Sequence, residues 1–187
     1  MRTISAILAI VCLCTIGVSS SYAEWSPEMG LKGAGFEIGL VNADQVDQTF
    51  GVGVFANLGT LAPNVMMEAY VDYWQTTEQF FVTSELRFRD ISLGARAKYA
   101  FNVSNSKLTP YAGAGLGIHF INARYEDSLV PLLNTSISET KLGLDIGGGM
   151  LAAVSDKASF VGEAWYSFVP DISQFSIQIG MEYALPW

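Results

Sequence analysis

Glycine alternates with small or apolar residues through the segment Pro110-Tyr111-Ala112-Gly113-Ala114-Gly115-Leu116-Gly117. Successive side chains of a β-strand point to opposite faces of the sheet, so alternation with a period of two residues predicts a strand. Glycine weakens a strand, because it contributes no side chain to packing, and often marks a place where another group approaches the backbone. The segment therefore predicts a strand with one apolar face and one face that leaves room for neighbouring side chains.

The same alternation recurs along the chain and defines eight runs. These runs are approximately Lys32–Leu40, Phe50–Leu58, Met66–Trp74, Asp90–Phe101, Pro110–Asn122, Thr140–Ala153, Ser159–Phe168 and Gln174–Leu185. Even-numbered connections look like tight turns and are 59–64, 102–107 and 155–157. Odd-numbered connections are 41–49, 75–89, 123–139 and 169–173, two of which are long.

Tight turns at one end and longer loops at the other are typical of barrels in the bacterial outer membrane, where the turns face the periplasm. We therefore predict an all-β fold, an eight-stranded antiparallel up-and-down transmembrane β-barrel.

The two faces of the predicted strands differ in composition. One face is apolar, as at Phe36, Val54 and Leu116, and carries no charge within the cores of the runs. The other face holds the charged residues Glu37, Glu68, Asp72, Arg96, Lys98, Lys141, Asp145, Glu163 and Glu182. It also holds most of the glycines, namely Gly33, Gly35, Gly39, Gly51, Gly53, Gly94, Gly113, Gly115, Gly117, Gly143, Gly147, Gly149 and Gly180. The interior of an eight-stranded barrel is only just wide enough for side chains, so we assign the glycine-rich, charged face to the lumen.

The charged lumen residues predict a plug. A buried charge is costly unless it is paired, so we expect a hydrogen-bonded ion cluster that fills the barrel. The alternative is a gate, in which an exchange of partners around Arg96 opens a narrow path for water.

Aromatic residues on the apolar face gather near the ends of the runs. Membrane barrels carry aromatic girdles at both interfaces. If the first strand runs outward, the outer girdle comprises Phe50, Tyr73, Phe120, Phe168 and Phe175. The periplasmic girdle then comprises Tyr99, Phe101, Phe160, Tyr183 and Trp187.

The first residues of the chain predict a Sec-type signal peptide. Arg2 is followed by the apolar run Ile4–Val18 and by Ser21-Tyr22-Ala23, with small residues at the positions that a signal peptidase reads. The apolar run is shorter than the ~20 residues of a membrane-spanning helix, which disfavours an anchor. We place cleavage after about Ala23, which leaves residues 24–187 as the barrel domain and removes both cysteines, Cys12 and Cys14.

Composition excludes several functions. The formal net charge is −8 and no basic run is present, so nucleic acid is not an expected partner. His119 is the only histidine and no His/Cys cluster exists, so we expect no metal site and no cofactor. We expect His119 to face the lumen as a hydrogen-bonded residue.

Two outer loops suggest surface contacts. Arg87 and Arg89 share the parity of the lipid face, and we hypothesise that they pair with lipopolysaccharide phosphates. The alternative is that the strands on either side extend beyond the membrane as a hairpin. The loop at 125–139 includes Leu129-Val130-Pro131-Leu132-Leu133 and is predicted to cap the barrel mouth or to contact a hydrophobic ligand.

The chain resembles the small outer-membrane β-barrel family that includes the OmpA transmembrane domain, OmpX and OmpW. The resemblance rests on the glycine-alternating segment 110–117 and on the last strand, Phe175-Ser176-Ile177-Gln178-Ile179-Gly180-Met181-Glu182-Tyr183. With Gly180, Tyr183 and Trp187 it implies a C-terminal signal for the barrel-assembly machinery. The family usually ends with an aromatic residue directly on the strand, whereas here Leu185 and Pro186 precede Trp187.

Together these features predict a structural or surface-interaction protein of the bacterial outer membrane, whose partners are lipid, lipopolysaccharide and the assembly machinery. The alternative is a narrow channel or transporter for small or hydrophobic solutes. A lipid-modifying barrel enzyme is a minor alternative. His119 is followed by Phe120-Ile121, unlike the His-x-Ser of lipid A deacylases, so we identify no catalytic residue.

Overall fold

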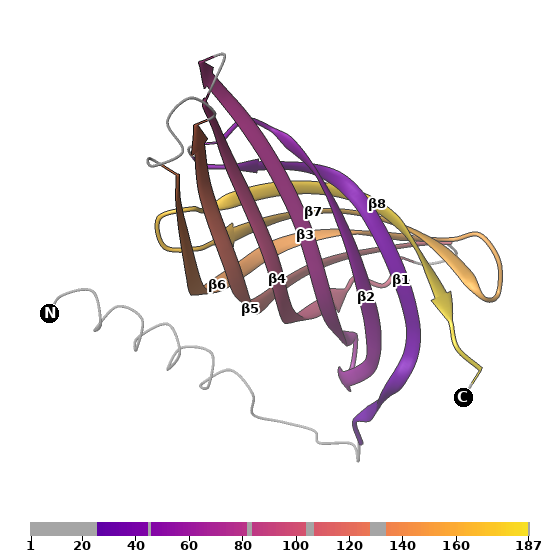
Figure 1. Cartoon of the computed structure of the whole chain (residues 1–187). Helices are drawn as coiled ribbons and strands as arrows, with labels where there is room; N and C mark the ends of the chain where they lie inside the picture. The colour runs from indigo at the N-terminus through magenta and orange to yellow at the C-terminus, as the bar shows by residue number, and fades with distance from the viewer. Residues whose placement is uncertain (1–25, 45, 82–83, 104–106, 128–133, 187) are drawn as a thin grey trace, which may run out of the picture.

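A computed structural model describes residues 26–44, 46–81, 84–103, 107–127 and 134–186, which form eight antiparallel strands closed into a barrel (Figure 1). The strands are β1 Glu28–Ala43, β2 Thr49–Ala62, β3 Val65–Phe81, β4 Ser84–Ala100, β5 Leu108–Asp127, β6 Thr135–Ala153, β7 Ala158–Phe168 and β8 Gln174–Ala184. Each strand pairs with its neighbour in sequence, and β8 pairs with β1 to close the barrel. The predicted fold is confirmed.

Among the described residues, no helix is long and apolar enough to cross a membrane. The signal peptide predicted over Met1–Ala23 lies outside the described residues, and so does Trp187.

The two connections predicted to be long loops are mostly strand, and the alternative of a hairpin that extends the strands on either side of Arg87 and Arg89 is confirmed. β3 and β4 remain paired from Val65–Tyr99 to Gln79–Glu85 without a shift of register, and β5 and β6 remain paired up to Tyr125–Thr135. The apolar alternation stops where the side chains turn polar, but the backbone hydrogen bonds of a ladder need no apolar face and continue beyond it. In Figure 1 the ends of β3 and β5 lie at the end of the barrel opposite the start of β1 and the end of β8.

The turn between β2 and β3 is tighter than the predicted 59–64. β2 continues to Ala62 and β3 begins at Val65. Asn64 adopts a left-handed backbone with φ 64°, which asparagine tolerates better than most residues.

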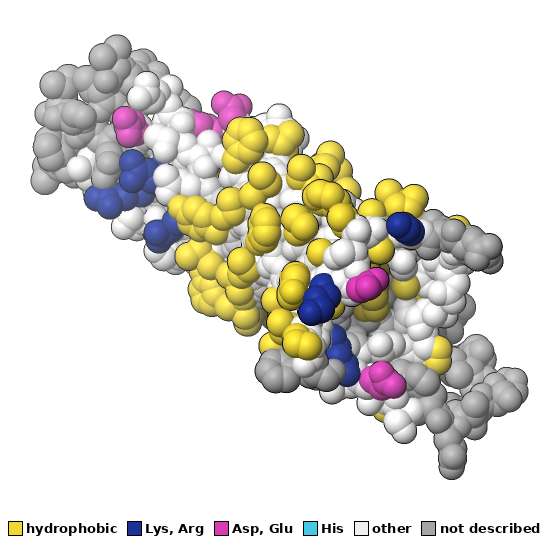
Figure 2. All heavy atoms as spheres, turned by 90° about the vertical axis from the view of Figure 1, so that its right-hand side faces the viewer, with side chains coloured by type: hydrophobic (Ala, Val, Ile, Leu, Met, Phe, Trp, Pro, Cys, Tyr) yellow, Lys and Arg dark blue, Asp and Glu magenta, His cyan; other side chains and the backbone are white. Residues whose placement is uncertain are grey.

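The faces of the barrel are as predicted. Leu142 on the outward face is 72% exposed, whereas Asp145 three residues later on the inward face is 0% exposed. Figure 2 shows hydrophobic side chains gathered over the middle of the barrel, with charged side chains toward both ends. This is the surface that a lipid bilayer requires.

The predicted girdle residues that the structure describes all point outward. They are Phe50, Tyr73, Phe120, Phe168, Phe175, Tyr99, Phe101, Phe160 and Tyr183, each exposed. The register puts Tyr73 and Phe120 in one row, because both pair with Ile91 of β4.

The glycines of β5 make room for large lumen side chains. A Cβ atom on Gly113 would lie 3.0 Å from the Trp165 ring, and one on Gly117 would lie 2.3 Å from the Tyr70 hydroxyl. The open face predicted for residues 110–117 therefore receives side chains from β3 and β7.

Candidate functional site in the barrel lumen

Arg96 of β4 lies at the centre of the lumen and contacts four carboxylates. Its Nη2 is 3.4 Å from Asp72 Oδ2, and its Nε is 3.4 Å from Asp145 Oδ2. Nη1 is 3.5 Å from Glu163 Oε1 and 4.0 Å from Glu68 Oε1. Arg96 is 2% exposed, and its partners come from β3, β6 and β7. One guanidinium thus ties three other strands together across the barrel.

Lys98 forms a second layer, two residues along β4 from Arg96. Its Nζ is 2.6 Å from Glu68 Oε2 and 2.9 Å from Glu163 Oε2. Glu68 and Glu163 therefore bridge the two cations, and the predicted ion cluster exists for Arg96, Lys98 and these partners.

Aromatic side chains that were not predicted from the sequence complete the cluster. The Tyr70 hydroxyl donates to Asp145 Oδ2 at 2.6 Å, and Trp165 Nε1 donates to Glu163 Oε1 at 2.6 Å. Tyr111 donates its hydroxyl proton to Glu163 Oε2. The Arg96 guanidinium carbon lies 3.7 Å from the centre of the Tyr70 ring, in cation–π contact. In their strands, all three aromatic residues lie on the lumen face that carries the charged residues. This shared face was the sequence signal that could have identified them.

Three predicted members form no ion pair with Arg96 or Lys98. Lys141 was wrongly placed in the central cluster, because its Nζ is 2.8 Å from Asp171 Oδ2 and 2.8 Å from Glu139 Oε2, toward the hairpin end of the barrel. Its parity is right, but residues of one face spread over the whole length of a strand. Glu182 was also misplaced.

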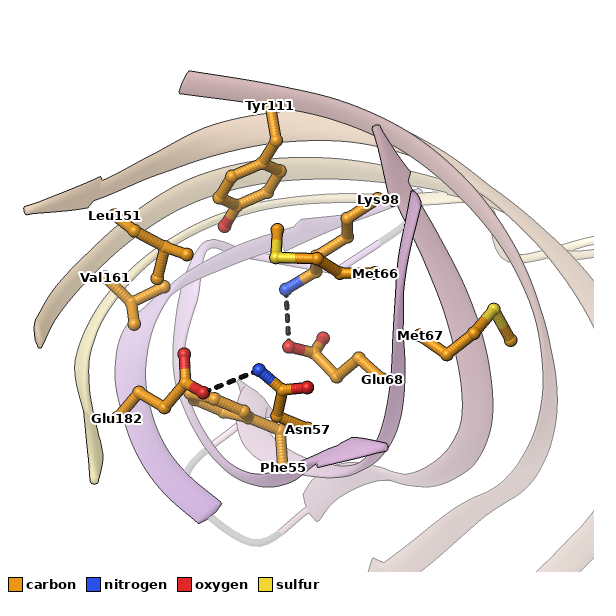
Figure 3. A pocket seen from close by; sticks show the side chains of 10 residues that line it. All are labelled: Phe55, Asn57, Met66, Met67, Glu68, Lys98, Tyr111, Leu151, Val161 and Glu182. Atoms are coloured by element: carbon orange, nitrogen blue, oxygen red, sulfur yellow. Dashed lines mark hydrogen bonds and ion pairs between the residues drawn. The ribbon is translucent and has the colours of Figure 1, made fainter. Parts of the chain in front are cut away.

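Glu182 lies at the other end, beside a cavity of about 10 Å³ (Figure 3). The Asn57 side-chain amide donates to Glu182 Oε1 at 2.8 Å, while Lys98 and Glu68 pair on the far side of the cavity. Phe55 and Val161 line the cavity and belong to a small apolar cluster. The lumen is filled here by both polar and apolar side chains.

The third exception is Glu37, which is only 2% exposed. Neither of its carboxylate oxygens has a hydrogen-bonding partner among the described residues.

A buried apolar layer lies in the lumen nearer the hairpin end of the barrel. Val41, Ala43, Val46 and Trp74 form a buried cluster. Trp74 also donates from Nε1 to Gln174 Oε1 at 2.7 Å. Buried side chains therefore fill the lumen at two levels. We call the Val41, Ala43, Val46 and Trp74 cluster the apolar plug, and the network around Arg96 and Lys98 the ionic plug.

His119 faces the lumen as predicted and is 1% exposed. Its Nδ1 is 2.8 Å from Asp90 Oδ2. Within the described ranges, no group of three or more His, Cys, Asp or Glu side chains is arranged to hold a metal ion.

Three arginines lie on the outward face near the hairpin tips. Arg87 and Arg89 are exposed, and Arg87 pairs directly across the ladder with Arg124, which is also exposed. The outward parity predicted for Arg87 and Arg89 is confirmed, and Arg124 joins them because β5 extends past its predicted end.

Comparison with solved structures finds the same fold. The Neisserial surface protein A (NspA) is 18% identical with a TM-score of 0.60, over 82% of this chain and 96% of that chain. A major outer membrane protein from Thermus thermophilus is 12% identical with a TM-score of 0.59, over 82% and 99%. Ail, the attachment invasion locus protein of Yersinia pestis, is 17% identical with a TM-score of 0.54, over 83% and 99%.

No curated protein sequence matches the chain. Residues 7–184 match the family described as "Outer membrane protein beta-barrel domain". The match spans nearly the whole chain. The eight strands of the barrel and its outward apolar band agree with that description. The chain belongs to the outer membrane protein β-barrel family.

Proposed function

We propose that this protein is a structural and surface-interaction barrel with a closed lumen. The observation that supports this role is the Arg96 network, in which one buried guanidinium meets carboxylates from three other strands. Breaking such a network leaves buried charges without partners, which costs several kcal/mol. The closed state is therefore the stable one, and the function lies on the outer surface.

Single-channel recording of the refolded protein tests the closed lumen. We expect little or no conductance, because eight strands leave space for side chains and at most a few waters. A heat-modifiability gel on the same sample verifies that the recorded protein is folded. A stable conductance of porin size would overturn the proposal.

The outward arginines are the proposed surface contact, with lipopolysaccharide phosphates as the ligand. Arg87 and Arg124 are direct ladder partners on β4 and β5, so two guanidinium groups lie side by side on the outward face. A phosphate group can accept charge-assisted hydrogen bonds from both. Arg89, two residues nearer the apolar band, extends the same outward row of charge.

Folding stability in vesicles with and without lipopolysaccharide tests this contact. We expect lipopolysaccharide to raise the urea midpoint of the native barrel and to have little effect on a variant with Arg87→Gln, Arg89→Gln and Arg124→Gln. The variant with Lys32→Gln, Lys107→Gln and Lys157→Gln, near the opposite end, is the charge-matched control and should respond like the native protein. An equal response of the arginine variant would rule out the contact.

For biogenesis, we propose that the last strand with Gly180, Tyr183 and Trp187 is read by the barrel-assembly machinery. Tyr183 is exposed on the outward face of β8, where a lipid-side partner can reach it. Tyr183→Ala should slow assembly in cells more than Phe160→Ala, an exposed aromatic on β7. Equal assembly of the two variants would contradict this role.

A second candidate function is passage of small or hydrophobic solutes. A cavity of about 170 Å³ at the mouth is lined by Phe88, Ile121, Ala123, Ile137 and Ile172, with Asp44, Glu139, Lys141 and Asp171 also present. Phe88 and Ile172 also pack against the apolar plug, so any solute must displace that plug to pass. Trp74→Ala should then raise solute uptake while an exposed-face variant, Phe50→Ala, should not. Unchanged solute uptake in Trp74→Ala would contradict the passage of solutes through the lumen.

A further inference from the structure

The central cluster holds more acids than bases. The carboxylates are Glu37, Glu68, Asp145 and Glu163, which are buried, and Asp72, whose side chain is 15% exposed; the cations among them are Arg96 and Lys98. Full ionisation would leave an excess of negative charge away from water, which is strongly unfavourable. The excess must be compensated inside the lumen.

The shortage of positive charge is sharpest at Glu37. Asp72 uses Oδ2 to contact Arg96, and its Oδ1 has no partner among the described residues. Glu37 makes no hydrogen bond with either oxygen in the described part of the chain. A Cβ atom built on Gly53 would lie 2.2 Å from Asp72 Oδ1 and 3.0 Å from Glu37 Oε1. The unpartnered oxygens of the two side chains thus border the same point.

Two adjacent buried carboxyl groups do not both ionise, because the second charge is repelled by the first. We propose that Glu37 and Asp72 share one proton, which serves as the missing hydrogen-bond donor and holds the ionic plug together. Loss of this proton at alkaline pH leaves two like charges face to face and loosens the plug. The pair makes the barrel sensitive to external alkalinity.

Among the described residues, no other charged group near Glu37 supplies that donor. The charged groups around it are Glu68 and Asp72 of β3, Arg96 of β4 and Glu163 of β7. Arg96 is already engaged with four carboxylates. On the flanking strands, Glu37 pairs with Gly53 of β2 and Gly180 of β8, neither of which has a side chain.

This proposal rests on the proposed closed lumen, but a different experiment can disprove each of the two. Recording at neutral pH tests the closed lumen, whereas dependence on pH tests the shared proton. The folded form holds a proton that the unfolded chain has already released, so stability falls as pH rises, until the folded form also loses this proton.

Urea unfolding in vesicles between about pH 6 and about pH 9 measures this loss. For one proton, the folding equilibrium constant of the native barrel should fall by up to about tenfold per pH unit. Glu37→Gln provides an amide donor to Asp72 at every pH and should remove that slope. Glu182→Gln, at the other end of the lumen, is the matched control and should keep it. Equal slopes in the native protein and Glu37→Gln would overturn the proposal.

A measurement on the unaltered protein tests the proposal even if a variant does not fold. Infrared difference spectra between about pH 6 and about pH 9 should show the carbonyl band of a protonated carboxyl at the lower pH and its loss at the higher. A folded Asp72→Asn variant should lack this band as Glu37→Gln does. Absence of the band in the native barrel at the lower pH would refute the shared proton whatever the variants do.

Discussion

Arg96 and Asp145 meet across an intervening strand: Nε of Arg96 on β4 is 3.4 Å from Oδ2 of Asp145 on β6. Gly115 of β5 is the ladder partner of both residues. The ion pair crosses β5 at a position that has no side chain. The glycine alternation of β5 therefore leaves the space that this ion pair occupies. A side chain at position 115 would take the space of the Arg96 stem.

Gly115→Ala should destabilise the barrel. Its Cβ would lie 2.5 Å from the backbone oxygen of Ala95 and 2.7 Å from Arg96 Cγ, so the ladder or the arginine must move. Overpacking of this kind typically costs about 1–3 kcal/mol. Urea unfolding in vesicles gives the change in free energy. The control is Gly162→Ala on the outward face of β7, where an added Cβ meets nothing within 4 Å. Similar losses in the two variants would contradict the assignment of faces.

Arg96→Ala should be among the most damaging single changes in the lumen. It leaves several buried carboxylates without their cation, and breaking a buried pair typically costs about 3–5 kcal/mol. The measurement is the free energy of unfolding in vesicles, with conductance recorded in parallel to detect leakage. Lys141→Ala is the control, since its partners Glu139 and Asp171 are well exposed and water screens that pair. A loss no larger than that of Lys141→Ala would show that the network does not hold the barrel together.

The architecture was predictable because alternation of two residues survives in every strand that crosses the apolar band. Parity also placed the inward glycines on the same face as Glu68 and Arg96. Strand ends were not predictable in the same way. β5 continues through Arg124 with polar residues on both faces, where hydrophobicity no longer distinguishes a strand from a loop.

The sequence did not predict how deep in the lumen each site residue lies. Parity states which face a residue occupies but not which residues on tilted strands share a level. Lys141 and Arg96 share a face yet bind different partners. Trp165 was overlooked because an aromatic residue beside Glu163 reads as packing, although its indole donates to that carboxylate.

The orientation of the barrel makes a prediction that needs only single cysteines. Both natural cysteines lie in the predicted signal peptide, so removal of this peptide would leave no competing thiol. The side chain of Asp171 is 83% exposed near the mouth, and Asp156 is exposed in the β6–β7 turn at the opposite end. A membrane-impermeant maleimide on intact cells should label Asp171→Cys and spare Asp156→Cys. Both should react after lysis, and the reverse pattern on intact cells would invert the barrel.

The two faces should respond oppositely to an added charge. Ile146 and Ile177 are 50% and 52% exposed within the apolar band, whereas Gln178 is 3% exposed in the lumen. Arginine in place of either isoleucine puts a charge near the middle of the bilayer, at a cost of about 2–4 kcal/mol. Gln178→Arg places the same charge beside Glu163, its ladder partner, in a lumen with excess carboxylates. It should cost less despite its greater bulk.

Folding free energies in vesicles decide this comparison. The expected order of damage is Ile146→Arg and Ile177→Arg above Gln178→Arg, and Gln178→Leu separates the effect of charge from that of altered packing. Because the arginine at 178 gains a carboxylate partner, its cost should also rise when Glu163→Gln is added, beyond the cost of Glu163→Gln alone. If Gln178→Arg were the most damaging of the three arginine variants, the lipid-facing and lumen-facing parities would have to be exchanged.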